Sequence, residues 1–211
     1  MPYIQIISFP ASDALQADPA LAKESAEIIS AKEGLISAWM GFQVEDSKIA
    51  YLISVWTSPD AHEKLKASPE FPRLQSNLKE NLFAGPPTFD FVELDQDHTH
   101  TFEAPYTRFG ILKTKDGQSK EEVRSQLVAL KDLSISQAFK GAHHPAGLGE
   151  LVGKPGSFIT LSGWDSPEGY GNAAASDAGK PAVAKLIDLA DRVSVAHVQL
   201  RKYKAGPTGI N

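Results

Sequence analysis

The sequence predicts an α+β protein built from two similar halves, each with the element order β-α-β-β-α-β. The motif W-x-S-P occurs twice, and its second copy at Trp164 follows the first at Trp56 by 108 residues (164 − 56). Each motif ends a β-rich apolar run and precedes a segment with helical periodicity. Repetition at this period indicates a duplicated domain, because solenoid repeats are far shorter.

Composition narrows the function classes. The 211 residues are 42% hydrophobic and 22% charged, as in ordinary globular proteins. A net charge of −5 without clustered Lys and Arg argues against nucleic-acid binding. The absence of Cys excludes disulfides, thiolate nucleophiles and Cys-based metal sites. With no run near the roughly 20 apolar residues of a membrane span and no secretory pattern, we expect a cytoplasmic protein that does not bind membranes.

The elements of the first half follow from local signals. Gly34 is a plausible helix stop, and Ser58 with Pro59 forms a cap and first turn for the helix after Trp56. The expected elements are a strand at Tyr3–Phe9, a helix around 21–29, strands at 35–44 and 49–56, helical segments from Pro59 to Leu82, and a strand at 88–94.

The second half repeats this order. Ser119 and Glu122 form an S-x-x-E capping box before an apolar helical stripe, and Ser166 with Pro167 repeats the cap after Trp164. We match "QAFKG" at 137–141 to "SAWMG" at 37–41. The expected elements are therefore a strand at Tyr106–Leu112, a helix from Ser119, strands at 134–142 and 157–164, a helix after Pro167, and a strand at 196–203.

Each half is thus a ferredoxin-like unit, with residues 1–97 and 106–211 as repeats and the polar segment 98–105 as linker. Such a unit has helices on one face of its sheet, and both faces of the strand at 49–56 are apolar. The second repeat's sheet can cover the free face, which predicts an intramolecular barrel.

The chain resembles the dimeric α/β-barrel superfamily, which includes antibiotic-biosynthesis monooxygenase-like and stress-responsive A/B-barrel proteins. The resemblance rests on W-x-S-x-[DE] at the end of a strand, followed by a His or aromatic residue and an "ASP" stretch, as in Trp56 to Pro69. It implies a pocket between the sheet and the helices of a half. It also implies functions that include cofactor-free oxygenases, polyketide cyclases, isomerases and haem-degrading enzymes.

His62 is the first candidate catalytic residue. It lies in the first turn of its helix, where the macrodipole disfavours imidazolium and leaves a neutral ring able to act as a base. A partly exposed helix residue is the alternative. The 108-residue offset places Tyr170 at the equivalent position, where it can bind substrate but would be a poor base near neutral pH.

His143 and His144 are the other candidate catalytic residues. They are expected at the end of a strand, opening a long Gly- and Pro-rich loop to Gly156 that could cover a pocket. A solvated loop is an equally good interpretation.

Aromatic residues and one further His are candidates for substrate binding. Trp56 and Trp164 are also explained as fillers of the sheet–helix junction, and His197 could equally lie on an outer face. The set comprises Trp39, Tyr51, Trp56, Phe139, Trp164, Tyr170 and His197.

The H-x-H pair His98 and His100 could hold a metal, but a solvated linker explains it better, so we expect no metal site and no bound cofactor. The leading hypothesis is a small enzyme that acts on a hydrophobic aromatic or polyketide-like molecule by His-assisted proton transfer, of monooxygenase, cyclase or isomerase type. The alternatives are a haem-binding or haem-degrading barrel and a non-catalytic stress-responsive binding protein. A homodimer of the duplicated chain is possible.

Overall fold

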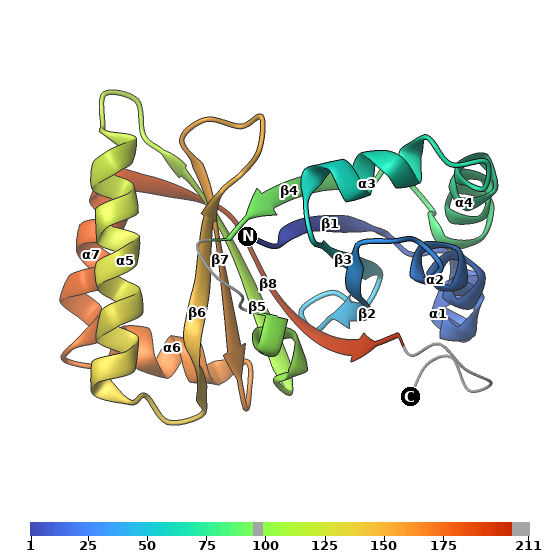
Figure 1. The fold of residues 1–211 in the computed structure, drawn as a ribbon. Coiled ribbons are helices and arrows are strands. Elements are labelled where there is room, and N and C mark those ends of the chain that lie inside the picture. Colours follow the sequence, from blue (N-terminus) through green and yellow to red (C-terminus); the bar gives the residue numbers. More distant parts are fainter. Residues whose placement is uncertain (95–98, 204–211) are drawn as a thin grey trace. The chain divides into compact units, whose positions relative to one another are not determined.

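The computed structural model describes residues 1–94 and 99–203. The chain divides into two compact units, Met1–Phe91 with Leu200–Asn211, and Val92–Gln199. We call them the first and the second unit. Within each unit, antiparallel strands carry the helices on one face (Figure 1). The expected α+β class with two ferredoxin-like repeats is confirmed.

The first unit has the strand order β4-β1-β3-β2. Gly34 has a φ of 86°, and a Cβ there would lie 2.5 Å from the Cβ of Ala61, so only glycine fits this turn after the helix. Ser58 caps the helix after Trp56 by accepting a hydrogen bond from the Ala61 N–H at 3.2 Å. The elements are β1 (Tyr3–Pro10), α1 (Asp13–Ala17), the 3₁₀ helix η1 (Pro19–Ala22), α2 (Lys23–Ser30), β2 (Leu35–Gln43), β3 (Ile49–Trp56), α3 (Pro59–Lys66), α4 (Phe71–Asn77), the π-helix η2 (Leu78–Leu82) and β4 (Thr88–Glu93).

The second unit has the strand order β8-β5-β7-β6. Its longest helix, α5, starts at the predicted capping box, where the Ser119 hydroxyl accepts from the Glu122 N–H at 3.3 Å. The elements are the 3₁₀ helix η3 (Thr99–Glu103), β5 (Tyr106–Thr114), α5 (Lys120–Gln137), β6 (Ala142–Glu150), β7 (Ser157–Trp164), α6 (Glu168–Ala175), α7 (Gly179–Leu189) and β8 (Ala190–Lys202).

Strand register makes the two units directly comparable. In the first unit Trp56 stands opposite Tyr3, and in the second unit Trp164 stands opposite Tyr106. Each tryptophan is buried in the core beneath its helices. The repeat seen in the sequence is therefore a repeat of three-dimensional position, and residues of the two units can be compared pair by pair.

One predicted strand is wrong. Residues 134–137 are the end of α5, Ala138 adopts a left-handed conformation with a φ of 43°, and the strand β6 begins only at Ala142. His143 and His144 accordingly lie inside β6, and the connection to β7 comprises only residues 151–156. The expected long loop over a pocket does not exist.

The error arose from the match between "SAWMG" and "QAFKG". The true counterpart of Trp39, which pairs with Ile53, is Gly147, which pairs with Leu161. The segment "AGLG" at 146–149 thus corresponds to "AWMG" at 38–41, at the same 108-residue offset (147 − 39) as the two tryptophans. Glycine in place of Trp39 hides this match from a comparison of side-chain types.

Among residues 1–94 and 99–203, no helix is long and apolar enough to span a membrane.

Candidate active site

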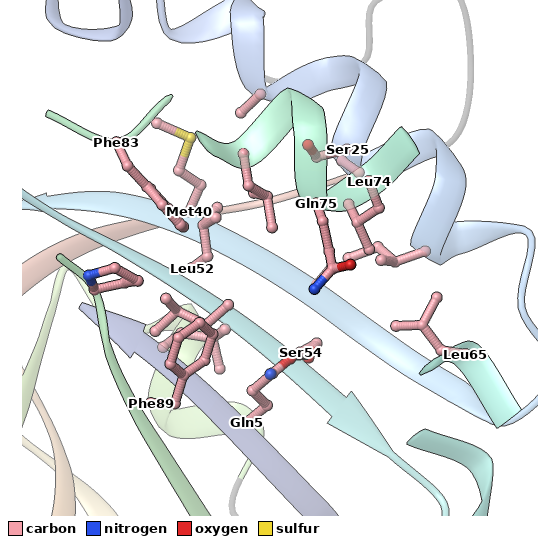
Figure 2. A pocket seen from close by; sticks show the side chains of 18 of the residues that line it. Gln5, Ser25, Met40, Leu52, Ser54, Leu65, Leu74, Gln75, Phe83 and Phe89 are labelled. Atoms are coloured by element: carbon pink, nitrogen blue, oxygen red, sulfur yellow. Dashed lines mark hydrogen bonds between the residues drawn. The ribbon is translucent and has the colours of Figure 1, made fainter. Parts of the chain in front are cut away.

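A cavity of about 760 Å³ lies in the first unit, between the strands and the helices that cover them (Figure 2). Gln5 stands opposite Ser54 and Ile7 opposite Leu52, so these four side chains project from the sheet on the same side. Gln75 extends from α4 into the cavity from the helical side. Most of the remaining lining is apolar and includes Ala22, Ile29, Met40, Leu65, Phe71, Leu74, Leu78, Phe83, Phe89 and Phe91. This volume and lining suit a drug-sized apolar ligand.

A chain of hydrogen bonds runs along the floor of the cavity. The Trp56 Nε1–H donates to the Ser54 hydroxyl at 2.9 Å, and that hydroxyl donates to the Gln5 Oε1 at 3.2 Å. The Gln5 carboxamide is thereby oriented with its NH₂ group left to donate to a ligand. Sequence analysis missed Gln5 and Ser54, although the tripeptide S-x-W recurs in both halves and was a usable signal.

His62 forms part of the cavity wall and is only 3% exposed. Its ring lies among three aromatic rings, with centroid distances of 5.9 Å to Tyr3, 5.6 Å to Trp56 and 5.3 Å to Phe91. Burial lowers the pKa of His62, an effect that the nearby Glu63 carboxylate opposes. The side chain is therefore a neutral imidazole at pH 7, as the sequence suggested, with burial as the main cause.

The Nδ1 atom of His62 has no hydrogen-bond partner within residues 1–94 and 99–203, and the Glu63 carboxylate is 3.8 Å away. A buried ring nitrogen without a partner is costly in a resting protein. Such a group is a candidate for proton transfer.

Trp39 lines the same cavity, and its Nε1–H donates to the Ser37 hydroxyl at 3.0 Å. Tyr51 is not among the lining residues, and it alternates with Leu52 along β3, so it projects to the other face, as Trp39 opposite Ile53 also does. Burial, together with Glu45 and Asp90, raises the pKa of the Tyr51 phenol to about 12. Tyr51 is therefore a neutral donor on the face away from the helices.

The second unit has only a small cavity of about 130 Å³ in the corresponding place. Arg108 stands opposite Ser162 as Gln5 stands opposite Ser54, so an arginine replaces the floor glutamine. The Arg108 guanidinium carbon lies 3.6 Å from the centroid of the Tyr170 ring, within cation–π range. Arg108 is buried, and together with Tyr170 it occupies much of the space that is open in the first unit.

Gly110 makes room for this arrangement. It pairs with Thr160 as Ile7 pairs with Leu52, so it replaces an isoleucine of the first unit. A Cβ on Gly110 would lie 2.7 Å from the Arg108 Nη1 and 2.8 Å from the Thr160 Oγ1. A larger residue at position 110 would therefore displace the Arg108 guanidinium or the Thr160 hydroxyl.

The remaining aromatic candidates of the second unit gather around this pair. Trp164 contacts Tyr170 edge to face at 6.0 Å and donates its Nε1–H to the Ser162 hydroxyl at 2.9 Å. Phe139 lies in the turn after α5 and also lines the small cavity. His197 stands opposite Arg108 on β8, where it is buried.

His143 and His144 line neither cavity. The His143 Nε2 lies 2.8 Å from the Asp165 Oδ1 near the surface, and the His144 Nδ1 lies 3.4 Å from the Ser134 hydroxyl. Burial, and secondarily His143, lowers the pKa of His144. The three candidate catalytic residues therefore belong to different units, with His62 in the first and His143 and His144 in the second.

His98 lies outside the described residues, so the H-x-H pair as a whole has no structural description. Within 1–94 and 99–203, no group of three or more His, Cys, Asp or Glu side chains is arranged to hold a metal ion.

No family model and no curated protein sequence matches the chain. Solved structures do. A candidate monooxygenase from Lactobacillus acidophilus NCFM matches 94% of this chain and 93% of its own, with a TM-score of 0.66 and 14% identity. One from Fusobacterium nucleatum covers 94% and 92%, with a TM-score of 0.70 and 10% identity. An anthrone oxidase-like protein covers 95% and 92%, with a TM-score of 0.69 and 18% identity.

These matches extend over nearly the whole length of both chains. The chain has the fold of the dimeric α/β-barrel proteins. The TM-scores of 0.66 to 0.70 establish a shared fold, whereas identities of 10% to 18% leave the reaction to be argued from the cavity.

Proposed function

We propose that this protein is a cofactor-independent oxygenase whose first unit binds a hydrophobic aromatic substrate. The observation that carries the proposal is the cavity of about 760 Å³, which has apolar walls, a neutral buried His62 and the Gln5 carboxamide. An apolar, partly enclosed site keeps water from a reactive carbanion and holds an aromatic ring system. The likeness in fold to candidate monooxygenases and to an anthrone oxidase-like protein is consistent with this chemistry.

The first step of the proposed reaction is proton abstraction by His62. A C–H bond conjugated with a ketone or phenol breaks, and its proton goes to the imidazole, which is neutral at pH 7 because burial lowers its pKa. Burial disfavours the imidazolium that forms, but the enolate formed at the same time is an opposite charge in the same low-dielectric cavity.

Gln5 is the proposed donor to the developing enolate oxygen. The Ser54 hydroxyl, itself bonded by Trp56, donates to the Gln5 Oε1 and so orients the carboxamide, and its NH₂ group needs little reorganisation when the negative charge appears. The carbanion carbon then forms a C–O bond with O₂, and the terminal oxygen of the resulting peroxide takes the proton from His62 to give a hydroperoxide. Loss of water leaves a carbonyl group, so one O₂ is consumed for each substrate.

Oxidation of 9-anthrone to 9,10-anthraquinone with purified protein and no added cofactor tests this proposal. Product absorbance and O₂ uptake should rise together, and His62→Gln should reduce the rate about 100-fold or more, as expected for loss of a general base.

Ala26→Phe, on α2 in the cavity lining, should abolish turnover by filling the site. The matched control His143→Gln alters a histidine outside both cavities and should leave the rate unchanged. If the His62→Gln variant still oxidises anthrone at the natural rate, His62 is not the general base. If the natural protein binds anthrone without oxidising it, a non-catalytic binding protein is the better interpretation.

Haem binding is the second candidate, since a single histidine in the wall of a large apolar cavity could also contact haem iron. Titration with haemin distinguishes the two. A shifted Soret band that disappears in His62→Gln would favour haem binding, whereas an unshifted band would leave the oxygenase proposal as the better one.

A further inference from the structure

The charged residues that line the first-unit cavity are all cationic. The chain as a whole has 26 Asp and Glu against 21 Lys and Arg. The cavity lining, in contrast, includes Lys66, Lys79 and Arg201 and no Asp or Glu. This local excess of positive charge is opposite in sign to the net charge of the protein.

Two of the three cations have no ion-pair partner within residues 1–94 and 99–203. The Lys66 Nζ lies 3.0 Å from the Glu63 Oε1, so its charge is compensated on its own helix. Neither Lys79 nor Arg201 forms an ion pair or a side-chain hydrogen bond with a residue in 1–94 or 99–203. Both are exposed, and both belong to the cavity lining.

Backbone pairing fixes Arg201 beside the cavity. The Tyr203 N–H donates to the Ala38 carbonyl at 2.8 Å, and Ala38 is itself part of the lining. Tyr203, two residues from Arg201 on an extended segment, lines the cavity too. Glu27 lies near enough to add to the effect of burial in raising the pKa of Tyr203, but the Lys23 ammonium is 3.8 Å from its carboxylate. Glu27 therefore has a cation close to it, and the charged side chains of the lining itself are positive.

The arrangement has two chemically distinct parts. The buried part of the lining offers apolar walls with the Gln5 and Ser54 groups, and the exposed part offers the Lys79 ammonium and the Arg201 guanidinium. A ligand that uses both parts has an apolar aromatic body and an acidic group at one end. Arginine suits a carboxylate in particular, because its planar fork can donate two parallel hydrogen bonds.

We propose that the ligand of the first-unit cavity is an aromatic carboxylate, with its ring system inside and its carboxylate held by Lys79 and Arg201. This inference rests on the proposed function, in that it takes the same cavity as the working site.

Two probes of the same shape distinguish the contribution of charge to the affinity from the contribution of shape. Anthraquinone-2-carboxylate and its neutral isostere anthraquinone-2-carboxamide are titrated into the full chain at low salt, with binding followed by quenching of tryptophan fluorescence. The carboxylate should bind about tenfold more tightly than the carboxamide, because a charge-assisted contact adds to a common apolar contribution. The advantage should shrink several-fold in high salt, since the two cations are exposed.

Charge removal at the two cations is the decisive comparison. The double variant Lys79→Gln with Arg201→Gln should bind both probes equally, with unchanged affinity for the carboxamide. Lys48→Gln is the matched control, because Lys48 is an exposed cation of the β2–β3 turn outside the cavity lining and should leave the tenfold ratio intact.

The outcomes separate the two proposals. Equal binding of the two probes by the natural protein would overturn the carboxylate inference and leave the cavity as the site of an uncharged ligand. A tenfold ratio that survives in the double variant would also overturn it. If neither probe binds, the proposed function fails together with the inference.

Discussion

The Arg108 guanidinium stacks on the Tyr170 ring at 3.6 Å, in the part of the second unit that corresponds to the open cavity of the first. The counterparts of these residues are Gln5 and His62, which both line the cavity of about 760 Å³. The change from His to Tyr between the two W-x-S-P motifs therefore belongs to a set of linked replacements. One unit keeps a cavity, and the other fills it with a buried cation and an aromatic ring.

Removing Ser54 should test whether the hydrogen bonds on the cavity floor serve function. Ser54→Ala takes away the acceptor of the Trp56 Nε1–H and the donor to Gln5, so we expect a loss of about 1–2 kcal/mol in unfolding free energy and a large fall in anthrone oxidation. Ser162→Ala is the matched control, because it removes the same bond from Trp164 in the second unit. Urea unfolding and turnover of both variants check this, and equal loss of activity in the two would contradict it.

Opening the second unit should create a second binding site. Arg108→Gln combined with Tyr170→His replaces the stacked pair by the residues of the first unit, and we expect the number of bound probe molecules per chain to rise from one to two. The variant should lose about 1–3 kcal/mol of stability, through the lost cation–π contact and the new cavity. Calorimetric titration gives the stoichiometry. Arg124→Gln on the exposed face of α5 is the control, and a stoichiometry of one in the double variant would count against the comparison of the two units.

Gly110 and Arg108 should be coupled. Gly110→Ala places a methyl group 2.7 Å from the Arg108 Nη1, so we expect a loss of about 1–3 kcal/mol in unfolding free energy. Gly110→Ala should lower the unfolding free energy clearly less when Arg108→Gln is already present, because the first unit accommodates Ile7 beside Gln5. A double-mutant cycle by chemical denaturation measures the coupling. If the two substitutions have additive effects on the unfolding free energy, the glycine at position 110 is not there to make room for the Arg108 side chain.

His62 should make stability depend on pH below neutrality. Its pKa in the folded protein is lowered from 6.5, mainly by burial, so the unfolded chain binds a proton that the folded protein resists. The contribution of the neutral His62 ring to the unfolding free energy is therefore fully present above pH 6.5. It is lost as the pH falls from 6.5 towards the lower pKa of the folded protein. His144, whose pKa is lowered too, acts in the same direction.

The variant His62→Phe should for this reason lose less unfolding free energy between pH 7.5 and pH 5.5 than the natural protein. Chemical denaturation at the two pH values gives the difference. An NMR titration of the His62 ring should have its midpoint below 6.5, and a midpoint at or above that value would contradict the assignment.

Local signals in the sequence determined most of the fold. The apolar runs from Tyr3 and Tyr106, the Ser-Pro caps after each tryptophan and the capping box at Ser119 act over a few residues, so each could be recognised without the rest of the chain. The constant 108-residue offset between the tryptophans then joined these elements into two equal units. The position of His62 in the first turn of α3 was also predictable in this way, because it follows from the cap, and its catalytic role stays a proposal.

Tertiary structure alone decided the site. Whether Gln5 faces Ser54, or Tyr51 faces away from the helices, depends on strand register, and a shift of one residue would reverse both. The strand β6 was misplaced for a similar reason, since only its pairing with β7 aligns Gly147 with Trp39. The difference between a cavity of about 760 Å³ and one of about 130 Å³ arises from how Arg108, Gly110 and Tyr170 fill one volume together, and packing of residues distant in sequence leaves no local pattern to read.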